Sequence, residues 1–324
     1  MEKDINTLLS VKGLRKYFKT PQGTVRAVDG IDFSIARGET LGLVGESGSG
    51  KSTVAYVLVG IYAATGGEVI FNNGQNLGRD FRKRPMNLKK DIQIVFQDPG
   101  SSLNPRRSIK QIIEVMLKTH RVVPKEDRMS KVAELLKRVG LPVEYMYKYP
   151  RSIGGGEQQI VAIARALATD PSFVLLDEPT SALDVSMQAK VINLLIDLQK
   201  EFSLTYLFIT HDLSLMRNVA NRIAIMYLGK TEEVACAADF FQKPLHPYTQ
   251  MLISSIPVAT EEEAAIKPKK IIARGEIPSP VNLPTGCGFH PRCPERMDIC
   301  SEVDPEMVAT GEAHFVRCHL YLHR

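Results

Sequence analysis

A short glycine-rich segment constrains the fold of this chain more than any other feature. Residues 45–53 read GESGSGKST, follow the apolar run 40–44 and precede a helix-like segment at 54–61. The pattern G-x-x-x-x-G-K-[ST] between a strand and a helix is typical of a loop that binds nucleotide phosphates. Its glycines let backbone N–H groups surround a phosphate, and the helix N-terminus adds positive potential. The sequence therefore predicts an α/β protein that binds a nucleoside triphosphate.

Individual positions of this phosphate loop have separate predicted roles. Lys51 can reach the β- and γ-phosphates, and the Ser52 hydroxyl can ligate Mg²⁺. A flexible Gly/Ser turn is the alternative, and the flanking strand and helix argue against it. The predicted nucleotide-binding residues are Gly45, Glu46, Ser47, Gly48, Ser49, Gly50, Lys51, Ser52 and Thr53.

Strands alternate with helices along most of the chain, which predicts a mostly parallel sheet covered on both faces. A helix-rich block at about 98–157 interrupts the alternation and is predicted to be an inserted subdomain. The predicted strands are 11–17, 24–28, 31–35, 40–44, 67–71, 92–96, 173–177, 205–210 and 222–227, and the predicted helices are 108–120, 127–139, 157–168 and 185–200.

The composition changes after about residue 255, where prolines and cysteines become frequent. We therefore divide the chain into a domain at 1–255 and a small, loop-rich extension at 256–324. Four of the five cysteines lie in that extension, at Cys287, Cys293, Cys300 and Cys318. In a reducing compartment such clustering favours metal binding over disulfides.

Charge and hydropathy limit the classes of function. The net charge is only +5, and the densest basic stretch, 79–90, is expected to be a solvated loop rather than a nucleic-acid site. The first residues, MEKDINTLLSV, lack the apolar core of a signal peptide, and no window is apolar enough to span a bilayer. We therefore expect a cytosolic chain whose membrane role, if it has one, comes through partners.

Polar side chains follow three of the predicted strands. Asp177 ends the apolar run 173–176 and can hold Mg²⁺, and Glu178 can polarise an attacking water as a general base. His211 follows the run 206–210 and can hydrogen-bond a γ-phosphate. Gln97 follows another run and can supply an oxygen to Mg²⁺ or to the water. These roles require that the strands are neighbours in the sheet.

Four segments follow the phosphate loop in order: QDP at 97–99, IGGGE at 153–157, DEPTSALD at 177–184 and HD at 211–212. The series resembles the ATPase subunits of ABC transporters over roughly residues 8–235. The resemblance implies a RecA-like parallel-sheet core, an N-terminal antiparallel β layer and ATP as the nucleotide. It also implies that Phe18, or alternatively Tyr17, stacks on adenine, and that Asp184 belongs to the D-loop.

Two further segments resemble the oligopeptide/dipeptide (and nickel) importer ATPases: PLHPYT at 244–249 and GFHPRCP at 288–294. By this resemblance the chain powers uptake of peptides or a similar small solute from the cytoplasmic face of the membrane. The implied partners are a second ATPase subunit and two transmembrane permease subunits, with an extracytoplasmic solute-binding protein acting indirectly. The sequence does not identify the solute.

The implied signature motif departs from the family pattern, Leu-Ser-Gly-Gly-Gln. Its residues here are Gly154, Gly155, Gly156 and Glu157, so the serine that donates a hydrogen bond to the γ-phosphate is missing. In the family this motif faces the phosphate loop of the partner ATPase. We therefore expect unequal sites in a heterodimer, or two equally weakened sites in a homodimer.

The spacing of the four cysteines is compatible with more than one bound metal. It is not the paired C-x₂-C spacing of ordinary zinc ribbons, while four thiolates can hold a 4Fe–4S cluster. We expect a cluster first, zinc second and unligated cysteines third, with His290 and His319 as substitute ligands. For the whole chain, the alternatives to an importer subunit are a soluble non-transport ABC ATPase and a subunit that clamps ATP without hydrolysing it.

Overall fold

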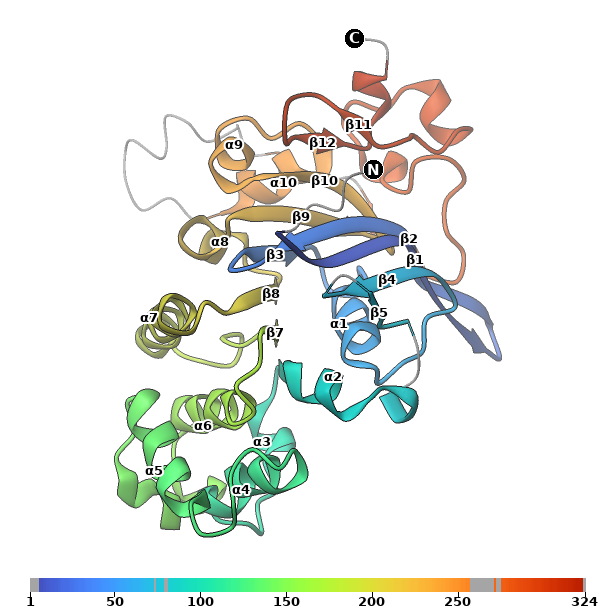
Figure 1. Cartoon of the computed structure of the whole chain (residues 1–324). Helices are drawn as coiled ribbons and strands as arrows, with labels where there is room; N and C mark the ends of the chain where they lie inside the picture. Colours follow the sequence, from blue (N-terminus) through green and yellow to red (C-terminus); the bar gives the residue numbers. More distant parts are fainter. Residues whose placement is uncertain (1–5, 73, 79–80, 257–270, 272–274, 323–324) are drawn as a thin grey trace.

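The computed structural model describes residues 6–72, 74–78, 81–256, 271 and 275–322. Two sheets, a helical subdomain and a C-terminal extension make up this structure (Figure 1). The helical subdomain lies at one end of the larger sheet, and the extension lies at the other. None of the described helices is both long and apolar enough to cross a bilayer.

The smaller sheet is antiparallel, as predicted, with strand order β2-β1-β4-β5. Its strands are β1 (Thr7–Thr20), β2 (Gly23–Ala36), β4 (Gly66–Phe71) and β5 (Gln75–Asn76). The predicted strands 24–28 and 31–35 are one strand. The pairing of β1 with β2 shifts register around Leu14, and Gly30 has a φ of +79°, so an irregularity interrupts the alternation without ending the strand.

The larger sheet has the strand order β11-β12-β10-β9-β3-β8-β7-β6. Its five parallel strands are β3 (Thr40–Val44), β6 (Ile92–Val95), β7 (Phe173–Asp177), β8 (Thr205–Thr210) and β9 (Arg222–Tyr227). Every residue of β3, β7 and β8 is buried. Burial on both faces explains why these strands are continuous apolar runs that the sequence predicts closely.

Helices cover the larger sheet. Helix α1 (Lys51–Val59) contacts β2 of the small sheet and β6, β7 and β8 of the large one, so it lies between the two sheets. The short α2 (Met86–Asp91) leads into β6, and α7 (Val185–Phe202) and α8 (Leu213–Val219) belong to the β7–β8 and β8–β9 connections.

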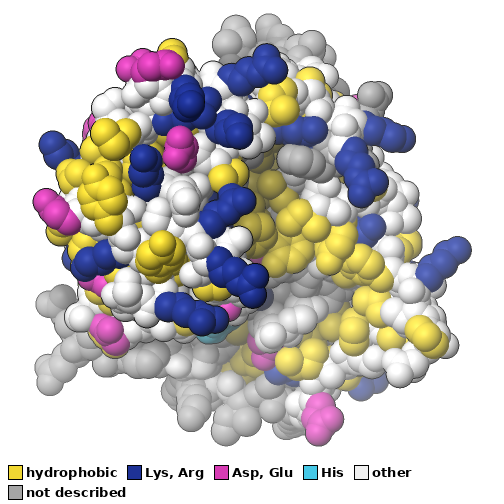
Figure 2. Space-filling view, turned by 90° about the horizontal axis from the view of Figure 1, so that it is seen from below, with side chains coloured by type: hydrophobic (Ala, Val, Ile, Leu, Met, Phe, Trp, Pro, Cys, Tyr) yellow, Lys and Arg dark blue, Asp and Glu magenta, His cyan; other side chains and the backbone are white. Residues whose placement is uncertain are grey.

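A helical subdomain lies between β6 and β7 in the chain. It contains α3 (Pro99–Ser102), α4 (Ile109–Thr119), α5 (Arg128–Arg138) and α6 (Gly155–Leu167), with 3₁₀ turns at Val143–Tyr147 and Pro150–Ser152. Helix α6 extends beyond the predicted limit of 157 and contacts β6, so it joins the subdomain to the sheet. Seen from this end, Figure 2 shows a hollow with hydrophobic side chains on its wall and Lys and Arg side chains along its rim.

The C-terminal segments are attached to the core sheet. Strand β10 (Lys230–Cys236) pairs antiparallel with β9, and α9 (Ala237–Gln242) and α10 (Pro247–Ser255) follow it. Beyond the predicted boundary, β12 (Phe315–Val316) pairs with β10 and with β11 (Val308–Ala309). The rest of the extension has 3₁₀ turns at His290–Arg292, Asp298–Ser301 and His319–Tyr321. The extension thus continues the main sheet, although residues 257–270 at the predicted boundary lie outside the described part.

Candidate functional site

The parallel strands bring the predicted catalytic residues together at one edge of the sheet. In the order β3-β8-β7-β6, Val44 pairs with Thr210, Asp177 with Ile209 and Val95 with Leu176. The residues that follow these strands therefore emerge side by side. Because ligands of open α/β sheets bind outside the carboxyl ends of the strands, this edge is the expected place for a nucleotide.

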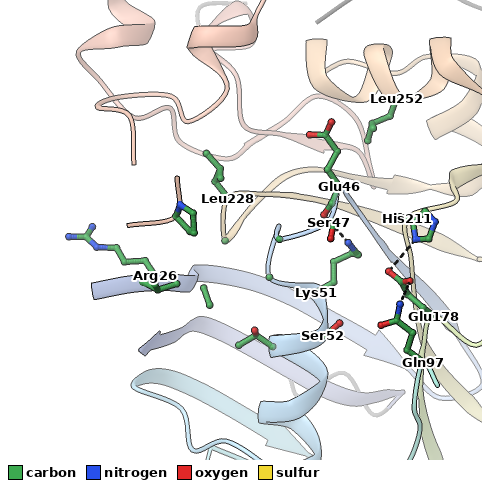
Figure 3. A pocket seen from close by; sticks show the side chains of 17 residues that line it. Arg26, Glu46, Ser47, Lys51, Ser52, Gln97, Glu178, His211, Leu228 and Leu252 are labelled. Atoms are coloured by element: carbon green, nitrogen blue, oxygen red, sulfur yellow. Dashed lines mark hydrogen bonds and ion pairs between the residues drawn. The ribbon is translucent and has the colours of Figure 1, made fainter. Parts of the chain in front are cut away.

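A pocket of about 790 Å³ opens at this edge (Figure 3). It is within the range of small-molecule sites. Of the predicted residues, seven of the phosphate loop line it together with Gln97, Glu178 and His211, while Gly45 and Ser49 are buried beneath the loop. The loop residues are Glu46, Ser47, Gly48, Gly50, Lys51, Ser52 and Thr53.

The buried side chain of Lys51 hydrogen-bonds the backbone of the phosphate loop. Its ammonium group donates to the carbonyl oxygens of Gly45 at 2.7 Å and of Glu46 at 3.0 Å, and the residue is only 5% exposed. Burial lowers the pKa of Lys51, and the nearby carboxylates, led by Glu178, oppose that effect. A buried ammonium among loop carbonyls can transfer its hydrogen bonds to phosphate oxygens when a nucleotide enters.

Glycine is required where the loop packs on its neighbours. Gly50 has a φ of +106°, and a Cβ atom there would lie 2.1 Å from the carbonyl oxygen of Ala27. At Gly45 a Cβ atom would lie 2.2 Å from the carbonyl oxygen of Met226. These contacts explain why the glycine positions of the motif tolerate no side chain.

Of the three predicted Mg²⁺ ligands, Ser52 and Asp177 lie in contact, whereas Gln97 hydrogen-bonds Glu178. The Ser52 hydroxyl donates to Asp177 Oδ1 at 2.9 Å. Asp177 is fully buried, and its Oδ2 has no hydrogen-bond partner in the structure. Burial raises the pKa of Asp177, and the Ser52 hydrogen bond partly offsets this. A buried carboxylate oxygen without a partner fits a hard cation, so these two residues would hold Mg²⁺, which would neutralise phosphate charge.

Glu178 lies between the other two predicted catalytic residues (Figure 3). Gln97 Nε2 donates to Glu178 Oε2 at 2.9 Å, and His211 Nδ1 lies 3.2 Å from Glu178 Oε1. Glu178 has a φ of +46°, a left-handed conformation that is uncommon away from glycine. The strained backbone aims the carboxylate at the pocket, where it can accept a proton from water.

Neither Phe18 nor Tyr17, the two candidates for stacking on adenine, is among the residues that line the pocket. Phe18 lies next to Tyr62. Its ring packs edge-on against Tyr62, with centroids 5.1 Å apart. The alternative, Tyr17, donates a hydrogen bond to Asp29, and its ring lies 5.9 Å from the guanidinium of the pocket residue Arg26. The two side chains follow one another along β1 and therefore point to opposite faces, so only one of them can face the nucleotide.

Several pocket residues were missed by the sequence reasoning. They come from β2, from the β9–β10 turn, from α10 and from the extension, and none belongs to a recognisable motif. They are Val25, Arg26, Ala27, Leu228, Gly229, Leu252 and Pro280. Only the tertiary fold brings these distant segments to the phosphate loop.

The signature residues lie elsewhere. None of the residues from Gly154 to Glu157 lines the pocket; they form the start of α6. Gly154 is the N-cap of α6 and offers no side chain, so Glu157 accepts the Gly154 N–H at 2.8 Å. At Gly156 a Cβ atom would lie 2.2 Å from the Met187 side chain, so a larger residue there would displace Met187.

Asp184 caps α7. Its carboxylate accepts the N–H of Met187 at 2.9 Å and the hydroxyl of Ser186 at 2.7 Å. These hydrogen bonds, with that of Ser186 the largest contribution, lower the pKa of Asp184. The next residue, Val185, is 82% exposed, which is unusual for a β-branched apolar residue.

The four cysteines of the extension are the residues predicted to bind a metal or cluster. Among the residues that the structure describes, no group of three or more His, Cys, Asp or Glu side chains is placed to hold a metal ion. All four thiols of the extension are free, and burial raises the pKa of Cys287 to about 12 and those of Cys293 and Cys318 to about 11. His290 and His319 instead contact the carbonyl oxygens of Cys287 and Val303.

The fold and the site define an ATPase of the ABC class. Residues 28–181 match the family model for ABC transporters. A dimeric ATP-binding cassette in a post-hydrolysis state bound to ADP and Pi aligns with a TM-score of 0.63 and 30% identity, over 71% of this chain and 99% of that one. The cbiO1 subunit of Clostridium perfringens aligns with a TM-score of 0.64 and 30% identity, over 74% and 92%.

The C-terminal part specifies the family. Residues 233–300 match the model for the oligopeptide/dipeptide transporter C-terminal region. The oligopeptide transport ATP-binding protein AppF of Bacillus subtilis (strain 168) is 46% identical over 322 residues, 97% of this chain and 98% of that protein. OppF of the same organism is 51% identical over 252 residues, 78% of this chain and 83% of that protein. The chain belongs to the oligopeptide transport ATP-binding proteins of the ABC transporter family.

Proposed function

We propose that this chain is the ATP-hydrolysing subunit of an importer for oligopeptides or dipeptides. The observation that carries the proposal is the similarity to AppF, an oligopeptide transport protein by name, which extends across 97% of the chain. The match of residues 233–300 to the oligopeptide/dipeptide C-terminal region supports it. Nickel and a sugar are the alternative solutes, since in this architecture other subunits select the cargo.

The proposed partners are two transmembrane permease subunits and a second ATPase subunit, at the cytoplasmic face of the membrane. An extracytoplasmic solute-binding protein would act indirectly, and no nucleic acid is involved. The hollow beside the helical subdomain (Figure 2) is the proposed docking surface for a permease. Large apolar side chains are exposed on both parts of the chain: Ile61 and Met86 on the sheet domain, and Tyr147 and Tyr149 on the helical subdomain.

The proposed reaction is ATP + H₂O to ADP and phosphate by in-line attack of water. Glu178 accepts the proton of the attacking water, and His211 donates a hydrogen bond to the γ-phosphate. Lys51 stabilises the charge that develops on the phosphate oxygens. In the structure both Glu178 oxygens are occupied by Gln97 and His211, so nucleotide binding has to rearrange these contacts.

We propose that the two sites of the ATPase dimer are unequal. The phosphate loop, Asp177, Glu178 and His211 of this chain would face the signature of a different subunit, and this would be the active site. The altered signature at Gly154 would face the phosphate loop of that subunit. The position of the signature outside the chain's own pocket supports an arrangement completed by a partner.

Purification from gently solubilised native membranes tests the assembly. We expect two permease subunits and a second ATPase to be isolated with this chain. Reconstituted in liposomes, the assembly should hydrolyse ATP faster when the binding protein is loaded with a peptide than when it is loaded with nickel. A complex with Glu178→Gln in this chain serves as the matched control and should show no stimulation.

Other outcomes would favour the alternatives. Isolation of the chain alone or with ribosomes would replace the importer by a soluble ABC ATPase. Retention of one ATP per chain without phosphate release would favour an ATP-clamping subunit. Stimulation by nickel but not by peptide would keep the importer and change its solute.

We also propose that Cys287, Cys293, Cys300 and Cys318 bind a 4Fe–4S cluster in the assembled protein. The four thiols are free, and ionisation of Cys300 would affect the other three, so they share one region. The four cysteines lack the paired C-x₂-C spacing of ordinary zinc ribbons, which favours a cluster over zinc. Iron and acid-labile sulfide, measured after anaerobic purification, test this: both should be absent in Cys300→Ser and retained in Cys236→Ser. Their absence from the parent protein would overturn it.

A further inference from the structure

The second residue of the phosphate loop is held by the C-terminal extension. Arg292, in the 3₁₀ turn His290–Arg292, donates from Nη1 to Glu46 Oε2 at 2.7 Å and from Nη2 to Glu46 Oε1 at 3.0 Å. This two-pronged contact joins residues that lie 246 positions apart in the sequence. Paired N–H···O bonds between a guanidinium and a carboxylate fix geometry as well as supplying energy.

The environment of Arg292 holds it rigidly. Its side chain is 7% exposed, compared with 25% for that of Glu46. Its guanidinium lies 5.7 Å from the ring centroid of Tyr227 and 5.9 Å from that of Phe289, and Nη1 is 3.3 Å from the Tyr227 hydroxyl. An arginine packed on aromatic rings has little conformational freedom to lose when it binds a carboxylate.

Glu46 is also held through its backbone. Its N–H donates to the Tyr248 hydroxyl at 3.0 Å, and its carbonyl accepts from Lys51 at 3.0 Å. Tyr248 belongs to α10 and packs on Tyr227 with centroids 4.7 Å apart and on Phe289 with centroids 5.2 Å apart. One loop residue is therefore held at three points: by Lys51 of the loop itself, by Tyr248 of α10 and by Arg292 of the extension.

Charge gives the contact a second role. Glu46 lines the nucleotide pocket, so its carboxylate lies on the loop that receives the negatively charged phosphates of ATP. In Figure 3 its side chain points away from Lys51 and toward α10. An unneutralised carboxylate at this position would repel the phosphates, and the guanidinium of Arg292 cancels that charge.

We propose that Arg292 is a positioning residue for ATP binding, through which the C-terminal extension holds the phosphate loop and neutralises Glu46. Arg292 does not touch the reacting atoms, which lie near Glu178 and His211 on the opposite side of the loop (Figure 3). The contact therefore acts on nucleotide affinity and leaves the chemical step unchanged. Through the Arg292–Glu46 contact, the C-terminal extension contributes to the geometry and charge of the ATP site.

The test compares variants within the full chain in its assembled complex. Arg292→Ala should raise the KM for ATP about tenfold, the size expected for losing hydrogen bonds between charged groups, while kcat stays within about twofold. In the Glu46→Gln background, where no carboxylate remains to be neutralised, the same substitution should raise KM by less than about twofold. Arg296→Ala, on an exposed arginine of the same extension, is the control and should match the parent.

A purely structural role for Arg292 predicts a different pattern. The KM would then rise equally in both backgrounds, or kcat would fall with KM unchanged, and either result overturns the proposal. If the Arg292→Ala variant does not fold, Arg292→Lys is tested in its place. Lysine keeps the positive charge but cannot make the two parallel hydrogen bonds of the guanidinium group. Arg292→Lys should raise the KM for ATP about threefold when Glu46 is present and leave it unchanged in the Glu46→Gln background. An equal rise of KM in both backgrounds would again overturn the proposal.

Discussion

The carboxylate of Glu157 accepts the backbone N–H of Gly154 at 2.8 Å and the hydroxyl of Tyr145 at 2.5 Å. The Tyr145 hydrogen bond, followed by that of the Gly154 N–H, lowers the pKa of Glu157 and keeps it ionised. Helix α6 therefore has its N-terminus capped by its own third residue. Helix α6, which begins within the predicted signature motif, is capped although the serine of the family pattern is missing at position 154. We therefore expect the missing serine to affect the contact with ATP and not the folding of the helix.

The substitution Gly154→Ser should therefore fit and restore a γ-phosphate contact. A Cβ atom at Gly154 would lie 3.5 Å from Glu157, an ordinary contact, and φ is −67°. A hydrogen bond to a charged group contributes about 1.5–3 kcal/mol, so we expect about tenfold faster turnover at the site this signature completes. Phosphate release by the complex measures it. Gly154→Ala is the matched control, since it adds the Cβ atom without the hydroxyl; equal rates for the two variants would contradict the prediction.

Glu178→Gln should stop turnover and retain nucleotide. General bases contribute about 10²–10⁴ in rate, so we expect loss of at least about 100-fold in phosphate release. The substitution keeps the shape of the side chain, and ATP affinity should stay within a few-fold because Lys51, Ser52 and Asp177 are intact. Single-turnover assays and filter retention of labelled ATP separate the two effects. Glu302→Gln, on an exposed residue of the extension, should change neither; persistent hydrolysis in Glu178→Gln would assign the base to another residue.

Tyr17, rather than Phe18, should stack on adenine. Its ring lies beside the pocket residue Arg26, whereas Phe18 packs on Tyr62. Stacking of a base on an aromatic ring contributes about 1–3 kcal/mol, so Tyr17→Ala should weaken ATP binding about tenfold. Phe18→Ala should lower the melting temperature and leave affinity nearly unchanged. Fluorescent-nucleotide titration checks both variants, and a larger loss of affinity in Phe18→Ala would restore the sequence-based assignment.

Because of Glu232, the free energy of unfolding should decrease as the pH rises. It lies on β10 at 2% exposure, and burial raises its pKa to about 7 from a usual value of 4.5. The folded protein then binds this proton more tightly than the unfolded chain, so the free energy of unfolding decreases between these two pH values and is flat above about 7. His246, 3.6 Å away, is no ion-pair partner, because burial lowers its pKa to about 4 and keeps it neutral.

The Glu232→Gln variant removes this dependence. Relative to the parent, it should gain stability on the order of a few kcal/mol from pH 5 to pH 8. Denaturant unfolding at several pH values measures the difference, in which the titration of His246 is common to both proteins. Glu302→Gln should track the parent at every pH. Parallel curves for Glu232→Gln and the parent would mean that this carboxyl group is ionised throughout.

The sequence predicted the parts of this fold that depend on local pattern. The buried strands β3, β7, β8 and β9 were located because burial on both faces leaves continuous apolar runs, and the phosphate loop because its backbone path requires glycine. The sequence could not show that β8 lies between β3 and β7, since strand order is a tertiary property. It also missed β12, because a two-residue strand carries no periodicity.

The candidate site residues divide in the same way, into those that a local sequence pattern predicts and those that only the tertiary structure brings to the site. Ser52, Asp177, Glu178, His211 and Gln97 could be predicted as candidates because each stands at the end of a predicted strand or in the loop motif. Arg26, Pro280 and Arg292 could not, because they reach the site from distant segments. The choice between Phe18 and Tyr17 is hard to make from sequence for another reason: adjacent strand residues differ only in the face they occupy, and the register of β1 is irregular there.

The pairing of β12 with β10 has a consequence for synthesis of the chain. A polypeptide leaves the ribosome from its N-terminus, and domains fold as they emerge. The phosphate loop at 45–53 appears early, whereas Pro280, Arg292 and the last strand of the sheet appear only after most of the chain has been made. A nascent chain can thus form the ATPase core and still lack a finished nucleotide pocket. If Arg292 positions the phosphate loop as proposed, tight ATP binding begins only when the protein is nearly complete.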